Sequence, residues 1–245
     1  MYYLCSEIMA NDYFQFKQFT IHQHRCAMKV GTDGTLLGAW AHVPVASSAR
    51  ILDIGTGTGL IALMMAQRFP KASVIGIDID PDAISQAQEN ISASPFANRI
   101  KICKENILNF DSQEEFDAIV SNPPFFVNAL TCPDHQRTMA RHTVSLTYQG
   151  LMHSAYRLLK PHGIFSIVIP SDCRTTLEAE AILEGFFVTR VCQIRTTPQK
   201  SPKRQLIEFS KHPVDKLFIE EGIIEESPNV RSQWYQQLTK DFYIR

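Results

Sequence analysis

A short glycine-rich segment has the residue types and spacing needed to bind a nucleotide-like ligand. Residues 53–59 read Asp-Ile-Gly-Thr-Gly-Thr-Gly, and an apolar helical run begins at Leu60. Glycines permit the left-handed backbone conformation and let the chain approach a ligand closely. The helix that follows would place its N-terminus beside that ligand. A dinucleotide-binding G-x-G-x-x-G pattern beginning at Gly55 would need its third glycine at the position that Leu60 occupies.

The glycine segment has an acidic partner further along the chain. Its D-x-G-x-G-x-G pattern resembles the S-adenosylmethionine loop of the Rossmann-like methyltransferases, and Asp78 ends the next apolar run, 73–78. A carboxylate at that place can accept hydrogen bonds from both ribose hydroxyls. Asp80 is better suited to cap the next helix, because Pro81 follows it. The residues expected to bind the cofactor here are Asp53, Gly55, Gly57, Gly59 and Asp78.

A second motif indicates the chemistry. Asn122-Pro123-Pro124-Phe125 follows the apolar run 116–120 and resembles the (D/N)PP(Y/F/W) motif of methyltransferases that act on planar amino nitrogens. The side-chain carbonyl of Asn122 and the backbone carbonyl of Pro123 can each accept one N–H of the amine. Two acceptors localise the nitrogen lone pair toward the methyl sulfonium, which stabilises the transition state. Phe125 offers a ring on which a flipped base can stack.

Similarity to one family then extends over nearly the whole chain. The sequence resembles the bacterial tRNA1(Val) (adenine(37)-N6)-methyltransferases, and the segments that carry the resemblance are 16–19, 25–34, 37–40, 87–91, 121–125, 140–142 and 203–204. The resemblance implies S-adenosylmethionine as the cofactor, the valine isoacceptor tRNA as the partner, and N6-methyladenosine at tRNA position 37 as the product. The alternatives are a protein glutamine N5-methyltransferase, a ribosomal-RNA guanine N2-methyltransferase, and an inactive RNA-binding protein of the same fold.

The resemblance also extends the set of cofactor residues. It places residues 29–33, Lys29 and Thr32 among them, on the cofactor side of the pocket, and Thr32 or Asp33 could also cap a helix at 34–42. Asn106 matches a position where many of these enzymes carry an aspartate that contacts the adenine of the cofactor, and Glu105 beside it could serve instead. Asn122 is expected to contact the cofactor as well as the amine.

Two basic regions are candidates for binding RNA. The connection 126–144 is long enough to be functional rather than a plain turn, and it contains Arg137 and Arg141. Between two strand-like runs, 187–194 and 204–210, lies a loop with Lys200, Lys203 and Arg204 at or beside its end. Basic side chains suit phosphate contact. The simpler alternative is that both regions are solvated loops, and the acidic stretch 217–227 could either repel RNA or pair with the hairpin.

The elements that position these residues alternate between strand and helix. Apolar strands are expected at 50–54, 73–78, 100–103, 116–120 and 163–169, with helices at 60–69, 81–92, 146–160 and 172–184 between them. Continuous apolar strands alternating with helices predict a doubly wound α/β fold with a mostly parallel sheet. The runs at 187–194 and 204–210 predict an antiparallel C-terminal edge hairpin. This is the class I architecture of S-adenosylmethionine-dependent methyltransferases, and we expect one domain over 1–245, with 1–49 as an N-terminal extension of a β segment plus a helix.

Composition excludes several other classes of protein. The chain has 245 residues, a net charge of −1 and 44% hydrophobic residues, as in an ordinary globular enzyme. Its six cysteines form no C-x-x-C pair, and its histidines show no metal-ligand spacing, so no metal site is expected. No signal peptide and no membrane-spanning run is predicted. The expectation is therefore a cytoplasmic enzyme, with a monomer favoured.

Overall fold

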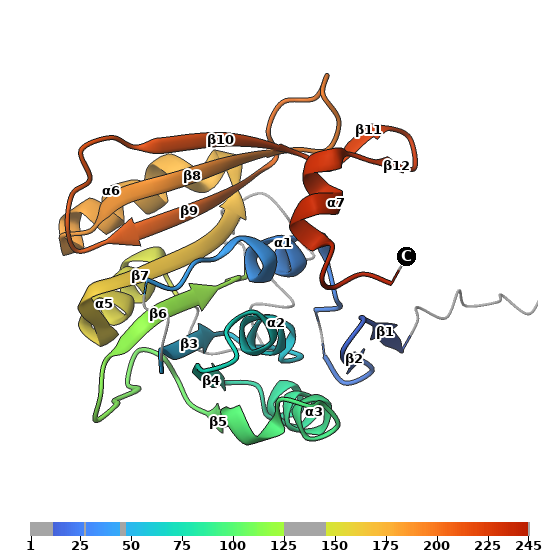
Figure 1. Cartoon of the computed structure of the whole chain (residues 1–245). Coiled ribbons are helices and arrows are strands. Elements are labelled where there is room, and N and C mark those ends of the chain that lie inside the picture. Colours follow the sequence, from blue (N-terminus) through green and yellow to red (C-terminus); the bar gives the residue numbers. More distant parts are fainter. Residues whose placement is uncertain (1–11, 27, 45–47, 125–145, 245) are drawn as a thin grey trace, which may run out of the picture.

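A central sheet of eight strands organises the molecule (Figure 1). The computed structural model describes residues 12–26, 28–44, 48–124 and 146–244. The strand order is β10-β8-β9-β7-β6-β3-β4-β5. Five neighbouring strands are parallel: β3 (Arg50–Ile54), β4 (Ser73–Asp78), β5 (Ile100–Lys104), β6 (Phe116–Ser121) and β7 (Leu159–Pro170). The doubly wound, mostly parallel sheet that the sequence predicts is confirmed.

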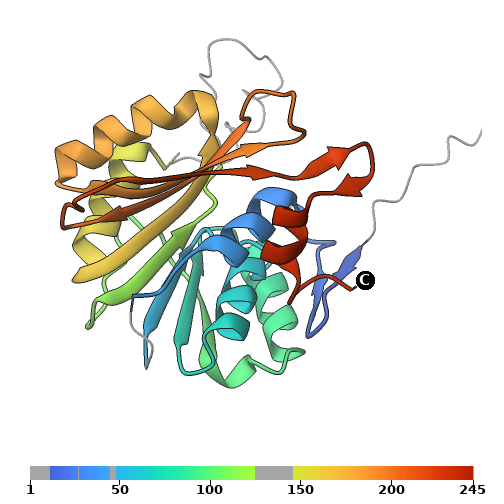
Figure 2. The same ribbon diagram turned by 45° about the horizontal axis from the view of Figure 1, so that its top comes forward.

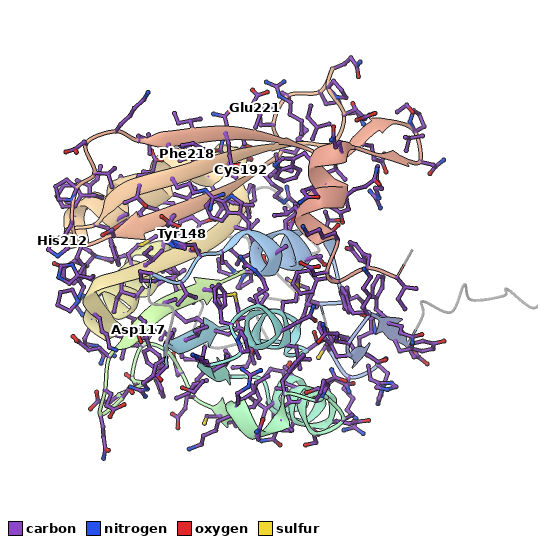
Figure 3. The ribbon with its side chains drawn as sticks, viewed as in Figure 1. Asp117, Tyr148, Cys192, His212, Phe218 and Glu221 are labelled. Carbon is purple, nitrogen blue, oxygen red and sulfur yellow. The ribbon has the colours of Figure 1, made fainter. Side chains whose placement is uncertain are left out.

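The C-terminal third of the chain completes the other half of the sheet. Strand β9 (Arg204–Ser210) is antiparallel to both β7 and β8 (Phe187–Arg195), which confirms the antiparallel hairpin. One strand that the sequence analysis did not predict, β10 (Phe218–Ile223), pairs in parallel with β8 and forms the outer edge. Figure 3 labels Phe218 and Glu221 on this strand. The acidic stretch therefore pairs with the hairpin, and Glu221 contacts Arg195 at 3.1 Å.

Helices cover both faces of the sheet, as Figures 1 and 2 show from two directions. Two apolar clusters lie between the sheet and these helices. The helices that pack on one face are α1 (Thr32–Trp40), α2 (Leu60–Arg68), α3 (Pro81–Ser92) and α7 (Gln233–Thr239). The helices on the other face are α5 (Tyr148–Leu158) and α6 (Arg174–Glu184). Helix α2 is buried along most of its length, which explains why its sequence is almost continuously apolar.

A side chain caps the start of α3, as predicted, but no side chain caps the start of α1. Asp80 caps α3, because its side chain accepts a hydrogen bond from the backbone N–H of Asp82, and Pro81 is the first helical residue. The predicted cap of α1 by Thr32 or Asp33 is wrong. That helix begins at Thr32, its N-cap is Gly31, and no side chain caps it. The Asp33 carboxylate is instead turned toward Arg204.

The two ends of the described chain lie together. Strands β1 (Tyr13–Gln15) and β2 (Thr20–His22) form an antiparallel pair, which overlaps the β segment predicted at 14–23 in the N-terminal extension. Phe16 forms a β-bridge with Tyr243 near the C-terminus. The remaining short elements are η1 (Ala97–Arg99), η2 (Ser171–Cys173), β11 (Glu225–Ser227) and β12 (Val230–Arg231). Among the described residues, no helix is long and apolar enough to span a membrane.

Candidate active site

The chain reverses its direction across the sheet between β3 and β6. From β3 the strands run outward through β4 and β5 on one side and through β6 and β7 on the other. Ligands of open α/β sheets bind at such a switch point, outside the carboxyl ends of the strands. The glycine segment follows β3, and Asn122 follows β6. The two predicted motifs therefore meet at the place where this architecture forms a site.

The glycine segment adopts a conformation that other residues would resist. Gly55, Gly57 and Gly59 have φ angles of +70°, +54° and +81°, in the left-handed region that favours glycine. A Cβ built on Gly55 or Gly57 would meet no atom within 4 Å. The backbone at these two residues therefore faces open space and can be approached closely by a ligand. Gly59 is the N-cap of α2, so the free N–H groups of that helix begin beside the same loop.

Asp78 joins the end of β4 to the glycine loop. Its Oδ2 accepts a hydrogen bond from the backbone N–H of Gly57 at 2.9 Å, and its Oδ1 accepts one from the N–H of Asp80 at 3.0 Å. Each carboxylate oxygen keeps a second lone pair. The side chain is thus held in one orientation at the carboxyl edge of the sheet, as a ribose-binding carboxylate would have to be.

Asp53 lies beneath the loop, fully buried at the end of β3. Its Oδ2 accepts hydrogen bonds from the Thr56 hydroxyl and from the N–H of Ala62, while its Oδ1 has no partner among the described residues. Burial raises the pKa of this carboxyl to about 7, although the two hydrogen bonds oppose the rise. The contacts place Asp53 in support of the loop, since it fixes Thr56 against the first turn of α2.

A pocket of about 390 Å³ lies over the glycine loop and brings residues from three segments together. Five residues expected at the cofactor site line it, namely Lys29, Thr32, Gly55, Gly57 and Asn122. Four others are not among its lining residues, namely Asp53, Gly59, Asp78 and Asn106. Val30, Gly31 and Asp33 of the predicted segment 29–33 line it too. The pocket is also lined by residues to which the sequence analysis gives no role in binding the cofactor, namely Met28, Gly34, Thr56, Thr58, Leu60 and Ile61. Only their neighbourhood to the glycine and Lys29 segments could have indicated them.

Asn122 has an acceptor available for a ligand. Its Oδ1 is buried and has no hydrogen-bond partner within the part of the chain that the structure describes. Its Nδ2 lies 3.8 Å from the sulfur of Met28. A buried polar atom without a partner is costly, so it is usually satisfied by a ligand or water where it persists. The orphaned oxygen therefore fits the predicted role of accepting an amine N–H.

The other predicted site residues do not line this pocket or lie outside the described residues. Pro123 is buried next to Asn122. Asn106 follows β5 at the same edge of the sheet, where its Oδ1 accepts a hydrogen bond from the N–H of Leu108. Phe125, Arg137 and Arg141 lie outside the described residues.

The basic hairpin loop stands at the same edge of the sheet. Arg204 is paired with Pro170 at the carboxyl end of β7, so the loop 196–203 projects from the edge that carries the glycine loop. Lys200 and Lys203 are exposed. Arg204 is only partly exposed, and its Nε donates to the Asp33 carboxylate at 2.7 Å. Among the described residues, no group of three or more histidines, cysteines or acidic residues could hold a metal ion.

Solved structures share this fold at low sequence identity. A predicted O-methyltransferase from Agrobacterium tumefaciens superposes with a TM-score of 0.67 and 17% identity, over 86% of this chain and 96% of that chain. A glycopeptide N-methyltransferase solved in complex with S-adenosylmethionine gives a TM-score of 0.55 and 13% identity, over 74% and 99% of the two chains. These likenesses establish the fold alone.

Sequence comparison establishes the family. Residues 46–220 match the model of a methyltransferase domain. A tRNA1(Val) (adenine(37)-N6)-methyltransferase from Phocaeicola vulgatus is 50% identical over 96% of this chain and 99% of its own length. Proteins of the same name from Bacteroides thetaiotaomicron and Tolumonas auensis are 48% and 42% identical over 96% and 97% of this chain. The chain therefore belongs to the family of tRNA1(Val) (adenine(37)-N6)-methyltransferases.

Proposed function

We propose that this enzyme transfers a methyl group from S-adenosylmethionine to N6 of adenine 37 in tRNA1(Val). The observation that carries the proposal is the orphaned Oδ1 of Asn122, which is buried beside the pocket over the glycine loop. The family supplies the identity of the tRNA and the position of the base. The geometry supports it with a buried acceptor that lacks a partner among the described residues, next to the pocket over the glycine loop.

Some residues of the site bind the cofactor, and others activate the amine. Gly55 and Gly57 present an open backbone to the cofactor, and Lys29 and Thr32 line the same pocket. Asp78 accepts hydrogen bonds from the ribose hydroxyls. The cofactor, when bound, supplies an electrophilic methyl group. Asn122 Oδ1 and the carbonyl of Pro123 each accept a hydrogen bond from one N–H group of the amine. These two bonds direct the nitrogen lone pair to that methyl group.

The proton balance needs no separate base. The nitrogen gains a methyl group and becomes positively charged, so one of its protons is acidic and leaves to water. Asn122 and Pro123 hold the nitrogen throughout, and Phe125 is proposed to stack on the adenine ring. Asn106 remains our proposal for the contact to the adenine of the cofactor, since its backbone follows β5 at the correct edge.

The tRNA is proposed to lie across the carboxyl edge of the sheet. Lys200 and Lys203 are exposed on the hairpin loop at this edge, where they can contact phosphates on either side of the target base. Arg137 and Arg141 are proposed as further phosphate contacts. Arg204, which the sequence analysis predicts to bind RNA, belongs to the same hairpin but already contacts Asp33.

We propose that residues 1–245 act as a single methyltransferase domain with 1–49 as an extension packed on it. The pocket supports this division, because Lys29 and Thr32 come from the extension and Gly57 and Asn122 from the body of the domain. A monomer working in the cytoplasm, where tRNA is found, stays our prediction.

The test is methyl transfer from labelled S-adenosylmethionine to an unmodified tRNA1(Val) transcript, followed by nucleoside mass spectrometry. A matched transcript with guanine at position 37 is the control. We expect N6-methyladenosine in the first transcript and no label in the second. Label in neither transcript, with cofactor binding intact, would contradict the proposed substrate and direct the search to ribosomal RNA and to protein glutamine.

A further inference from the structure

One ion pair joins the basic hairpin to the wall of the cofactor pocket. The Nε of Arg204 donates to Oδ2 of Asp33 at 2.7 Å, across 171 positions of sequence. The side chains are 33% and 22% exposed, so both charges are largely shielded from water. Shielded pairs interact more strongly than the fully exposed pairs that contribute little. The Nη1 of Arg204 also donates to the backbone carbonyl of Lys203, which further restricts the guanidinium.

Asp33, the acidic partner, lies in the pocket wall close to Asn122. Asp33 lines the pocket in the first turn of α1, and the next residue, Gly34, faces Asn122. A Cβ built on Gly34 would lie 3.9 Å from Nδ2 of Asn122 and 3.3 Å from the side chain of Leu60. A small shift of this turn would therefore change both the pocket wall and the setting of Asn122.

The first turn of α1 begins without a side-chain cap. The carbonyl of its N-cap, Gly31, accepts hydrogen bonds from the backbone N–H and the hydroxyl of Thr35, whereas no side chain caps the free N–H groups of the turn. The basic partner, in contrast, is rigidly held. Arg204 is the first residue of β9, and its backbone is paired with Pro170 in β7 and with Ile194 in β8.

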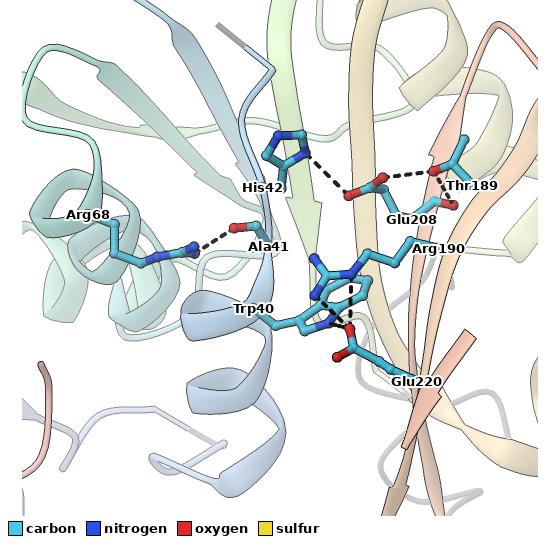
Figure 4. A network of polar contacts seen from close by, with 8 residues as sticks. All are labelled: Trp40, Ala41, His42, Arg68, Thr189, Arg190, Glu208 and Glu220. Atoms are coloured by element: carbon cyan, nitrogen blue, oxygen red, sulfur yellow. Dashed lines mark hydrogen bonds and ion pairs between the residues drawn. The ribbon is translucent and has the colours of Figure 1, made fainter. Parts of the chain in front are cut away.

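The opposite end of α1 is fixed to the same half of the sheet (Figure 4). The indole N–H of Trp40 donates to Glu220 at 2.8 Å, and Arg190 contacts the same carboxylate at 2.6 Å. The Arg190 guanidinium also lies 4.2 Å from the centre of the Trp40 ring. Helix α1 is therefore held at its last turn by β8 and β10 and at its first turn by Arg204 of β9.

We propose that Arg204 is a positioning residue of the cofactor pocket, which acts through Asp33, and not a ligand of RNA phosphate. Lys200 and Lys203 take the phosphate contacts, whereas Arg204 holds the first turn of α1 against the glycine loop. The inference rests on the proposed function, because it concerns the same pocket and the same hairpin.

The experiment measures two affinities for each variant of the full chain. S-adenosylhomocysteine binding is measured by calorimetry, and binding of unmodified tRNA1(Val) by filter retention over a range of salt concentrations. We expect Arg204→Met and Asp33→Asn each to weaken S-adenosylhomocysteine binding roughly fivefold to tenfold, with the double variant no weaker than either single one, since the two residues act as a unit. The salt dependence of tRNA binding should stay as in the wild type. Arg204→Lys, which keeps the charge and shortens the reach, should fall between the wild type and Arg204→Met.

Two control variants make the result specific. Glu178→Gln removes an ion pair of the same 2.7 Å length and similar exposure, Arg174–Glu178 on α6, and should leave S-adenosylhomocysteine binding unchanged. Lys203→Met, next to Arg204, should weaken tRNA binding alone. Weaker tRNA binding with a reduced salt dependence in Arg204→Met, and unchanged S-adenosylhomocysteine binding, would overturn the inference and make Arg204 a phosphate ligand. Additive effects of Arg204→Met and Asp33→Asn would overturn it as well. A wild-type enzyme that binds the cofactor and fails to methylate tRNA would instead contradict the proposed function.

Discussion

The backbone N–H of Gly57 donates to the Asp78 carboxylate at 2.9 Å, so the glycine loop after β3 is tied to the end of β4. The bond spans 21 positions and joins two residues that the sequence analysis expects at the cofactor site. Gly57 itself has a φ of +54°, in the left-handed region that favours glycine. Loop and carboxylate therefore form one preorganised unit.

Replacing Asp78 by alanine should chiefly weaken cofactor binding. The variant loses the ribose acceptor and the restraint on the loop together, so we expect the dissociation constant of S-adenosylmethionine to rise at least about tenfold. Calorimetry with S-adenosylmethionine measures it directly. Asp82→Asn, an exposed carboxylate in the first turn of α3, is the matched control. Unchanged cofactor affinity in Asp78→Ala would remove Asp78 from the cofactor site.

Replacing Asn122 by alanine should affect the chemical step. The orphaned Oδ1 acts on the amine of the target base, so its loss should lower kcat by roughly two or more orders of magnitude while cofactor affinity stays near that of the wild type. Asn122→Asp keeps an oxygen acceptor in the same place and should retain more activity than the alanine variant. Single-turnover methylation of tRNA1(Val) measures the chemical step separately from cofactor binding. A variant with normal kcat and weak cofactor binding would assign Asn122 to the cofactor alone.

The strands and the glycine loop are predictable from the sequence because their signals are local. Each buried strand reads as a short apolar run that a turn residue ends, as Asn122 ends β6, and the glycine spacing defines a loop without reference to the rest of the chain. The start of α3 was equally predictable, since Asp80 and Pro81 form a local cap.

Sequence reasoning failed where a partner distant in sequence decides the structure. Strand β10 contains Glu220 and Glu221, which argue against an apolar strand, yet Arg190 and Arg195 on β8 neutralise them at the sheet edge. The sequence favours Asp33 as a helix cap, because no residue near it in the chain indicates an ion pair with Arg204. Both cases depend on ion pairs whose two members are brought together only by the completed sheet.

The hairpin lysines should control binding of the tRNA without controlling the cofactor. Removing Lys200 and Lys203 together should raise the KM for tRNA and flatten the dependence of log affinity on log salt by a slope of roughly one to two, as expected for two lost phosphate contacts. Filter binding at several salt concentrations measures the slope. Lys216→Ala is the control, because this exposed lysine lies before β10, at the opposite end of the hairpin. An unchanged slope in the double variant would place the tRNA elsewhere.

The buried carboxyl of Asp53 should make the stability of the ligand-free enzyme depend on pH. Burial raises its pKa from 3.8 to about 7 in the folded chain, so the folded state binds this proton more tightly than the unfolded state. Its contribution to the free energy of unfolding is therefore most favourable below pH 4, falls as the pH rises from about 4 to 7, and is constant above that. Asn is nearly isosteric and can still accept the hydrogen bonds from Thr56 and Ala62. Asp53→Asn should thus lose this dependence, and its Tm relative to the wild type should rise between pH 4.5 and pH 8. Thermal unfolding at the two pH values measures the difference, and a constant Tm difference would mean that Asp53 is ionised throughout this range.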